Sequence, residues 1–357
     1  MVIPEVTELE VAAIIRSLPS KPSSIDDFST EIIKNNAELI ALPLKILFNE
    51  SIRSGNFPNI FKHATVIPIH KKDSTAELTN YRPISLLNCF SKIFEKIMKK
   101  YLTYHMSMNN ILTDHQYGFQ SGKSTFQAQE EFSKFVYSNL DKGNMILALF
   151  IDYKKALCSP WRLAKKKLKH YGIRNNLLEW FKSYLSGRSQ VTKFGQETSD
   201  SADITIGLPQ GSVLGAVLFN IFINDLVNAT SLMNPILFCD DSTLFVSGKN
   251  LNELVEIANK ELLLISEWCL SNKMSLNSEE TVAMFLSNRR VRNCPPIILK
   301  NGFNFDVVKR VESVKFLGIY YDQQMKFKRH ISYLTTKLSR TAGMLYRLSQ
   351  FLPAHIL

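Results

Sequence analysis

The sequence predicts an α+β fold, because apolar strands and amphipathic helices both occur along it without strict strand–helix alternation. The continuous apolar run "NMILALFID" (residues 144–152) is typical of a buried strand, whereas apolar residues three or four positions apart predict helices elsewhere. With 357 residues, 45% of them hydrophobic and 21% charged, the chain has a globular composition and room for two or three subdomains.

The beginning of the chain predicts helices on both sides of one strand. Helices are expected through most of residues 1–60, and the apolar-faced segment "AELIALPLKILFNESIRSG" should end at Gly55. A strand is expected over "HATVIPIHKK", followed by a polar turn over "DSTAELTN". From residue 90 to 101, apolar residues recur at helical spacing and lysines occupy the other faces. Two interpretations of this basic helix stay open, a solvated outer surface and an RNA-contacting one.

The remaining elements follow from the same patterns. After the strand that ends in Asp152, we expect helices over "SPWRLAKKKLKHYG" and over residues 176–185. The segment "QVTKFGQETSDSADITIG" is hairpin-like, and "SVLGAVLFNIFINDL" predicts a mostly buried helix. Beyond "ILFCDDSTLF" we expect a helix at about 250–270, strands near residues 282 and 316, and a basic helix from about residue 328.

Charge and cysteine usage limit the class of protein. The net charge of +11 favours a polyanionic partner, with nucleic acid first and an anionic membrane surface second. The longest apolar stretch, "VLGAVLFNIFI", is shorter than the roughly 20 residues that span a bilayer, and the N-terminus lacks the pattern of a secretory signal. Five scattered cysteines without a CxxC pair predict reduced thiols. We therefore expect an intracellular protein, nuclear or cytoplasmic, without a membrane span.

Two adjacent carboxylates, Asp240 and Asp241, interrupt the apolar run "ILFCDDSTLF". Burying one ionised carboxylate costs several kcal/mol, and a like-charged neighbour makes ionisation harder still. Divalent cations would offset that cost, and Asp152 at the end of another apolar strand could join the same site. Two such ions, about 3.5–4 Å apart, catalyse phosphoryl displacement. The alternative is an Asp pair that caps a turn, but the apolar residues on both sides favour the metal interpretation.

Several blocks of the sequence carry a resemblance. The box "LFCDD" resembles the FADD or YADD box of reverse transcriptases, with Cys239 where Ala is usual. "GLPQGSVLGAVLFNIFINDL" is similar to the "G-x-PQGS-x-LGP-x-LF-x-x-INDL" segment of non-LTR (LINE-type) retrotransposon reverse transcriptases. Further matches, in the family's order, are "NYRPISLLNCFSKIFEKI", "DHQYGFQSGKST", "LFIDYKKA", "ISEWCLSNKMSLN" and "VKFLGIYYD". The resemblance covers nearly the whole chain, most firmly residues 55–322, and the jockey-like group is the nearest class.

The resemblance implies a right-hand polymerase with an antiparallel palm sheet and packed helices. Residues 1–54 would form a helical lead-in, 55–140 the fingers, 141–322 the palm and 323–357 a truncated thumb. The implied enzyme is a nucleotidyltransferase, an RNA-directed DNA polymerase that joins dNTPs to a primer 3′-hydroxyl by two-metal phosphoryl transfer. Its implied partners are an RNA template, a DNA primer and dNTPs; no membrane is expected, and the sequence identifies no protein partner.

The resemblance also implies which residues form the site. Asp152 and Asp240 would hold two Mg²⁺ ions, the carbonyl of Tyr153 would be a further ligand, and Asp241 would complete the acidic cluster.

Five other residues would contact the substrates, namely Lys71, Arg82, Leu157, Gln210 and Gly211. Arg82 and Lys71 would grip the incoming triphosphate, because a guanidinium fork binds phosphate bidentately; a solvated loop lysine is the alternative for Lys71. Gln210 and Gly211 would lie against the nucleotide and template, where Gly permits close backbone approach. Their alternative role is a plain Pro-Gln-Gly turn that caps the next helix.

The sequence departs from the family at several positions. Leu157 stands where an aromatic residue normally packs against the sugar, which predicts weaker exclusion of ribonucleotides, and Cys158 replaces an acid. Glu279 and Glu280 precede Thr281, where the family has a Lys thought to assist the leaving pyrophosphate. No endonuclease segment is expected before the polymerase, and the family continues beyond "FLPAHIL". A second hypothesis is therefore a catalytically degenerate reverse-transcriptase-like fragment that only binds nucleic acid.

Two other enzyme classes fit the sequence less well. In "GFQSGKST", Gly118 and Gly122 enclose three residues, whereas a P-loop needs four, so Lys123 is either a template contact or a solvated lysine. A DDE-type transposase also uses three carboxylates and two metals, but it needs neither adjacent Asp residues on a hairpin nor the "LPQGS" block.

Overall fold

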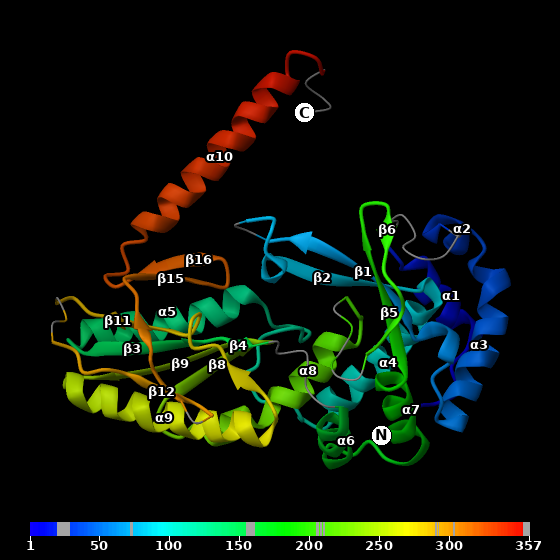
Figure 1. The fold of residues 1–357 in the computed structure, drawn as a ribbon, viewed down its shortest axis with the longest axis horizontal. Coiled ribbons are helices and arrows are strands. Elements are labelled where there is room, and N and C mark those ends of the chain that lie inside the picture. Colours follow the sequence, from blue (N-terminus) through cyan, green and yellow to red (C-terminus); the bar gives the residue numbers. More distant parts are fainter. Residues whose placement is uncertain are drawn as a thin grey trace. The chain divides into compact units, whose positions relative to one another are not determined.

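The computed structural model describes residues 1–19, 29–71, 74–154, 161–204, 207, 209, 211–289, 291, 293–302 and 304–352. The chain forms two compact units, each assembled from separate stretches of sequence (Figure 1). Unit 1 comprises Met1–Phe119, Lys155–Asp225 and Ser271–Met274. Unit 2 comprises Gln120–Lys154, Leu226–Leu270 and Ser275–Leu357.

The helices of unit 1 pack around an aromatic core. They are α1 (Glu8–Arg16), α2 (Thr30–Asn35), α3 (Ala37–Ser54), α4 (Cys89–Met108), α6 (Trp161–His170), α7 (Asn175–Leu185) and α8 (Gly215–Ile223). Phe57 lies edge-on to Trp180 and Tyr184, at ring-centroid distances of 5.4 and 5.1 Å, which is a favourable aromatic geometry. Helix α3 ends at Gly55, whose φ of +70° is left-handed and suits glycine, as the sequence predicts.

Helix α4 is the basic amphipathic helix expected from the sequence. Its apolar face is buried, including Phe94 and Ile97. Two of its lysines bind α1, because Lys96 donates to Ser17 and Lys100 to Glu10. These contacts favour a structural role for this part of the helix over an RNA-contacting one.

The sheet of unit 1 has the strand order β2 (Tyr81–Leu87), β1 (His63–His70), β5 (Arg188–Phe194) and β6 (Glu197–Thr198), and β7 (Ala202–Ile204) also pairs with β5. Strands β1 and β2 form an antiparallel hairpin, whereas β1 and β5 are parallel. Two short 3₁₀ helices, η1 (Asn59–Phe61) and η2 (Leu78–Asn80), lead into β1 and β2. The parallel pair joins segments more than a hundred residues apart, so sequence periodicity alone does not predict it.

The sheet of unit 2 has the order β14 (Lys309–Arg310), β11 (Val282–Leu286), β3 (Met145–Ile151), β9 (Asp241–Gly248) and β8 (Asn234–Phe238). The pairs among β11, β3, β9 and β8 are all antiparallel. Helices α5 (Thr125–Asp141) and α9 (Leu251–Ser271) cover opposite faces of this sheet (Figure 1). Strand β3 is therefore apolar on both faces, which explains its continuous apolar sequence rather than an alternating one.

Smaller elements complete the described chain. Strand β4 (Tyr153–Lys154) pairs with β10 (Ser275–Leu276), β12 (Ile298–Asn301) with β13 (Asn304–Val307), and β15 (Ser313–Phe316) with β16 (Ile319–Asp322). The 3₁₀ helix η4 (Asn224–Ala229) continues α8. Helix α10 (Lys328–Leu348) begins where the basic helix was expected, contacts β16, and buries none of its own residues.

The α+β class predicted from the sequence is confirmed, and so are the main helices and strands it rests on. Cys89, Cys239 and Cys269 are buried and in the reduced form. Within the part of the chain that the structure describes, no helix combines the length and apolarity needed to cross a bilayer.

Candidate active site

The acidic pair lies at the tip of a tight hairpin in unit 2. Strand β8 ends at Phe238, which pairs with Asp241 at the start of β9, so the turn consists of Cys239 and Asp240. Cys239 has a φ of +57°, a left-handed conformation that such two-residue turns require. Because Asp240 belongs to the turn, the strand alternation that would separate two neighbouring side chains does not apply to this pair.

Asp152 reaches the same end of the sheet from β3. The last β3–β9 pair is Ile151 with Ser242, so the next position along, Asp152, falls opposite Asp241. Asp152 is half-buried, and Asp240 and Asp241 are exposed. Unit 2 therefore brings together the three carboxylates that the sequence singles out.

The three carboxylates interact electrostatically. Although Asp241 is exposed as a whole residue, its carboxyl group is partly shielded from water, which raises its pKa to about 6, and the charges of Asp240 and Asp152 add to the shift. A bound cation would reverse this effect, because it favours the ionised form of every carboxylate around it.

This donor set fits a hard divalent cation. Carboxylate oxygens are the ligands that Mg²⁺ prefers, and Mg²⁺ binds through one or two of them while it keeps waters and takes oxygens from substrate phosphates. Among the described residues, no group of three or more His, Cys, Asp or Glu side chains is placed so that it could hold a metal ion. An ion at this sheet end would therefore need further ligands from water and substrate.

A second set of bonds holds these segments in place. Buried Tyr153 donates its hydroxyl to Ser242 Oγ at 3.0 Å, which joins the residue after Asp152 to the residue after Asp241. Burial raises the pKa of the Tyr153 phenol far above its usual range, so it stays a neutral donor. Asn277 and Thr281 bind Asp152 directly.

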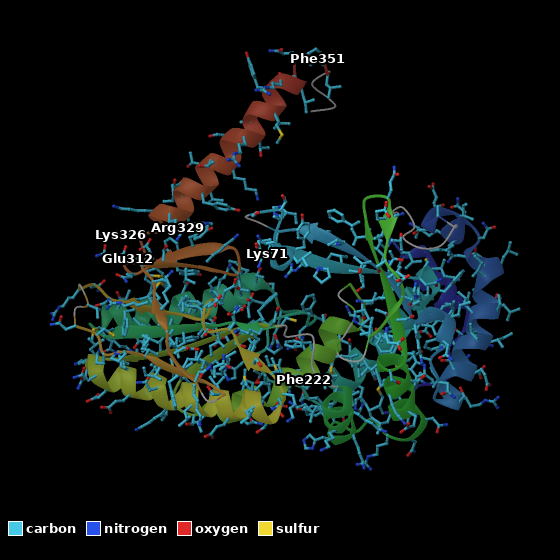
Figure 2. The ribbon with its side chains drawn as sticks, in the orientation of Figure 1. Lys71, Phe222, Glu312, Lys326, Arg329 and Phe351 are labelled. Carbon is cyan, nitrogen blue, oxygen red and sulfur yellow. The ribbon has the colours of Figure 1, made fainter. Side chains whose placement is uncertain are left out.

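The predicted substrate-binding residues that the structure describes lie in unit 1. Arg82 is exposed on β2, paired with Ile69, and Lys71 follows the end of β1, where its N–H donates to the Asn80 carbonyl (Figure 2). Both therefore lie at the loop end of the β1–β2 hairpin, where residues 71–80 connect the two strands.

Gly211 packs against the same strand. Its φ is +114°, and a Cβ atom there would lie 2.8 Å from the Ser85 carbonyl oxygen of β2. Only glycine fits this approach without displacement. This contact is with the protein's own backbone, so the approach of Gly211 to nucleotide and template stays a prediction. Gln210, Leu157 and Cys158 lie outside the described residues.

A buried carboxylate anchors the loop that follows Gly211. Glu95 of α4 is fully buried and accepts bonds from Ser212 Oγ (3.0 Å) and from the Val213 N–H (2.5 Å). Burial raises the pKa of the Glu95 carboxyl above its usual value. The hydrogen bond from Val213 and the charge of buried Arg188 oppose this shift but do not cancel it. Ser212 also accepts from the Gly215 N–H and so caps α8, and its hydroxyl pairs with that of Tyr184 at 2.7 Å.

Sequence reasoning missed Glu95, Ser242, Asn277 and Thr281. A signal for Glu95 was present, since it falls among the apolar positions of α4 beside Phe94, where an unpaired acid would be costly. The sequence signal for Asn277 and Thr281 was weaker. It consisted only of two residues with hydrogen-bonding side chains in "MSLNSEET", directly before an apolar strand.

Comparison with known proteins identifies the class. Residues 69–321 match the family described as "Reverse transcriptase (RNA-dependent DNA polymerase)". A "Probable RNA-directed DNA polymerase from transposon BS" of Drosophila melanogaster is 29% identical over 344 residues, which are 92% of this chain and 37% of that relative. The "RNA-directed DNA polymerase from mobile element jockey" of the same species is 25% identical, over 95% of this chain and 38% of the relative. A "Retrovirus-related Pol polyprotein from type-1 retrotransposable element R1" of Bradysia coprophila is 27% identical, over 84% of this chain and 30% of that relative.

The fold is that of a right-hand polymerase with antiparallel-rich sheets. The chain belongs to the reverse transcriptase family, and its relatives from jockey and R1 elements confirm the resemblance to non-LTR retrotransposons. Enzymes of this family are nucleotidyltransferases that act on nucleic-acid template, primer and nucleotides with divalent metal ions. The chain spans little more than a third of the length of the BS and jockey relatives.

Proposed function

We propose that this protein is an RNA-directed DNA polymerase, which extends a DNA primer on an RNA template with dNTPs. The observation that carries the proposal is the meeting of Asp152, Asp240 and Asp241 at one end of an antiparallel sheet. The alternative, a degenerate fragment that only binds nucleic acid, gives no reason to keep three mutually repelling carboxylates at that place.

In the proposed reaction the primer 3′-hydroxyl attacks the α-phosphorus of a dNTP, and pyrophosphate leaves. Asp152 and Asp240 would hold two Mg²⁺ ions with the Tyr153 carbonyl, and Asp241 would complete the negative cluster. When bound, the metal activates the attacking hydroxyl and stabilises charge on the leaving oxygen. The protein's own part is to keep the carboxylates aimed at one place, which the Tyr153–Ser242 bond supports.

The unit 1 residues would bind the nucleotide. Arg82 and Lys71 supply positive charge at the loop end of the β1–β2 hairpin, suited to a triphosphate. Gly211 and Gln210 would lie against the nucleotide and template, and Leu157 against the sugar. The contact of Gly211 with β2 supports placing this loop beside Arg82.

Primer extension tests the proposal. Purified protein with an RNA template, an annealed DNA primer, dNTPs and Mg²⁺ should produce extended DNA. Addition of EDTA should stop extension, and excess Mg²⁺ should restore it, because the carboxylates alone cannot offset the developing charge. Binding of the primed template without any extension would support the degenerate fragment instead.

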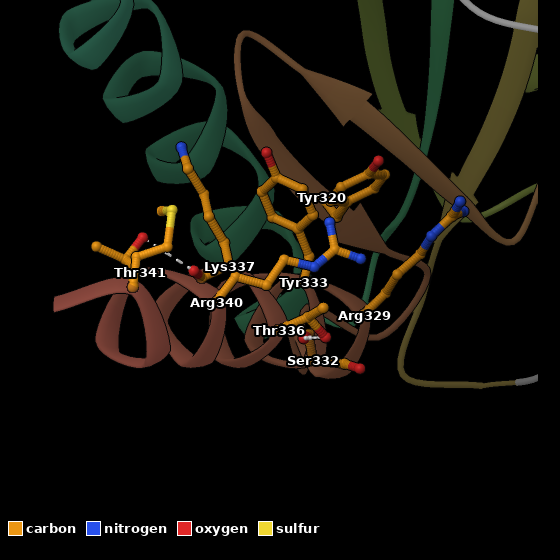
Figure 3. Close-up of a pocket in the computed structure, with 9 residues that line it drawn as sticks. Tyr320, Arg329, Ser332, Tyr333, Thr336, Lys337, Arg340 and Thr341 are labelled. Atoms are coloured by element: carbon orange, nitrogen blue, oxygen red, sulfur yellow. Dashed lines mark hydrogen bonds between the residues drawn. The ribbon is translucent and has the colours of Figure 1, made fainter. Parts of the chain in front are cut away.

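A basic pocket in unit 2 supports nucleic-acid binding. It has a volume of about 750 Å³ and lies between Tyr320 of the β15–β16 hairpin and one side of α10 from Arg329 to Met344 (Figure 3). Its lining residues are Tyr320, Arg329, Ser332, Tyr333, Thr336, Lys337, Arg340, Thr341 and Met344. Three of these are cationic, none is acidic, and Arg329 stacks over the Tyr320 ring at 4.6 Å. Cations mixed with aromatic rings and hydroxyls suit a sugar–phosphate backbone.

Charge reversal on α10 should weaken nucleic-acid binding. The double variant Lys337→Glu/Arg340→Glu is expected to lower affinity for a primed template about 10-fold or more, and to reduce the salt slope of log K by about 2. Fluorescence anisotropy over a salt series would measure both quantities. The matched control is Lys142→Glu/Lys249→Glu, two exposed lysines at the opposite end of the sheet from the carboxylates. Equal losses in both double variants would mean that only net charge matters, and the pocket would then have no specific role.

A further inference from the structure

Asp152 is tethered to the segment that follows β10 by three hydrogen bonds. Its N–H donates to Thr281 Oγ1 at 3.2 Å, and its carbonyl accepts from the Asn277 N–H at 2.9 Å. The Asn277 side chain adds the third bond, from Nδ2 to Asp152 Oδ2 at 2.8 Å. The Thr281 N–H donates to the Asn277 carbonyl at 2.9 Å, which closes the turn.

Two of these bonds hold the main chain, and the third holds the carboxylate itself. The backbone bonds fix where Asp152 lies after β3 ends, with fully buried Thr281 as one anchor. The amide of Asn277 fixes the direction of the carboxyl group, because it engages one particular oxygen. A hydrogen bond to an ionised acceptor is among the stronger kinds in proteins.

The chemistry of the amide suits a carboxylate that must bind a cation. A lysine or arginine at position 277 would cancel the negative charge of Asp152 and compete with the metal ion. The carboxamide is neutral, so it orients the carboxylate and leaves its charge available. Outer contacts of this kind orient metal ligands in many enzymes.

We infer that Asn277 is a positioning residue for Asp152, holding its carboxylate in the direction that metal binding needs. The inference rests on the proposed catalytic role of Asp152 and deepens it. It assigns a function to the "SLNSEET" segment that does not depend on the lysine absent from positions 279 and 280. A plain turn cap is the competing explanation, and it requires only the backbone bonds.

The positioning role and the turn-cap role predict different results for the variant Asn277→Ala. This variant keeps the Asn277 N–H bond to the Asp152 carbonyl and the closing Thr281 bond, so the turn should still form. For a positioning residue, we expect kcat to fall about 10- to 100-fold and the half-saturating Mg²⁺ concentration to rise by a similar factor, with the Kd for primed template unchanged. The variant Asn277→Asp, of equal size, should lose more, because it sets a second carboxylate against Asp152.

The matched control is Asn301→Ala. The Asn301 amide donates to the carbonyl of Leu276, the residue before Asn277, at 3.1 Å and does not bind Asp152. This variant should keep the Mg²⁺ dependence of the wild type. If Asn277→Ala and Asn301→Ala lose stability alike and neither changes the Mg²⁺ dependence, Asn277 is a turn cap and the inference is wrong.

A measurement without substrate separates this inference from the proposed function. Mg²⁺ or Mn²⁺ alone should raise the thermal midpoint of the wild-type protein, and Asn277→Ala should reduce that rise. If the wild type shows the rise but no extension, the proposed function fails, while a reduced rise in Asn277→Ala still supports positioning. If Asn277→Ala shows the full metal-induced rise, the positioning role is refuted whatever the polymerase activity.

Discussion

An Asp240→Asn variant is expected to lose primer extension by about 10³-fold or more, which corresponds to about 4 kcal/mol of transition-state stabilisation. The amide is nearly the same size as the carboxylate but has no charge to hold a divalent cation. Asp240 lies in the exposed turn between β8 and β9, so little packing depends on it. The thermal midpoint and the metal-free affinity for primed template should therefore stay close to those of the wild type. Single-turnover extension with a saturating dNTP would measure the loss.

Asp141→Asn is the matched control for this substitution. Asp141 ends α5, is exposed, and precedes β3, whereas Asp152 follows that strand. The control makes the same change of charge in the same unit and should extend primers at the wild-type rate. Extension by Asp240→Asn at more than a tenth of the wild-type rate would remove Asp240 from the catalytic group.

The parts of the fold that could be predicted are those specified by local sequence. The apolar run at 145–151 forms β3, because both faces of that strand are covered and no alternation is needed. Gly55 ends α3 since it can take the left-handed conformation. The acidic pair was expected at a hairpin tip, and the turn at Cys239 and Asp240 agrees. In each case the signal lies within a few residues of the feature it predicts.

The parts that could not be predicted depend on contacts between distant segments. Asn277 binds Asp152 across 125 residues, and Glu95 binds Val213 across 118. Each is a polar residue whose neighbours in sequence give no sign of its partner. The pairing of β1 with β5 is of the same kind, because a parallel contact between segments this far apart leaves no local pattern.

The residues of the candidate site also fall into a group that the sequence predicts and a group that only the fold reveals. The resemblance placed Asp152, Asp240 and Asp241 in one cluster, and the sheet register explains how they meet. It did not show that a tyrosine–serine bond and an asparagine–threonine turn support the cluster, since the blocks that contain Tyr153 and Asn277 do not indicate which residues these two bind. What the motifs identify are groups proposed to touch substrate or metal; the groups that hold them in place emerge only from the fold.

Replacing Asp241 by Asn should change stability and activity in opposite directions. Partial burial and the charges of Asp240 and Asp152 raise the pKa of Asp241 from 3.8 to about 6, so its ionised form is disfavoured in the folded protein. Without metal at pH 7, the variant loses that repulsion, and its thermal midpoint should rise by roughly 1–3 °C. Extension should fall about 100-fold or more, because a charge that helps to hold the cations is gone.

The pH dependence distinguishes this cause from a change in packing. At about pH 3 and below, Asp241 is mostly protonated in both the folded and the unfolded wild-type chain, so the repulsion is absent and the two proteins should be nearly equally stable. As the pH rises to about 6, the unfolded chain releases this proton before the folded protein does, and the stability of the wild type falls relative to that of the variant. Differential scanning calorimetry of metal-free protein at pH 3 and pH 7 would measure the gap in stability between the wild type and the variant. A variant less stable than the wild type at pH 7, or a gap of equal size at both pH values, would contradict charge repulsion as the cause.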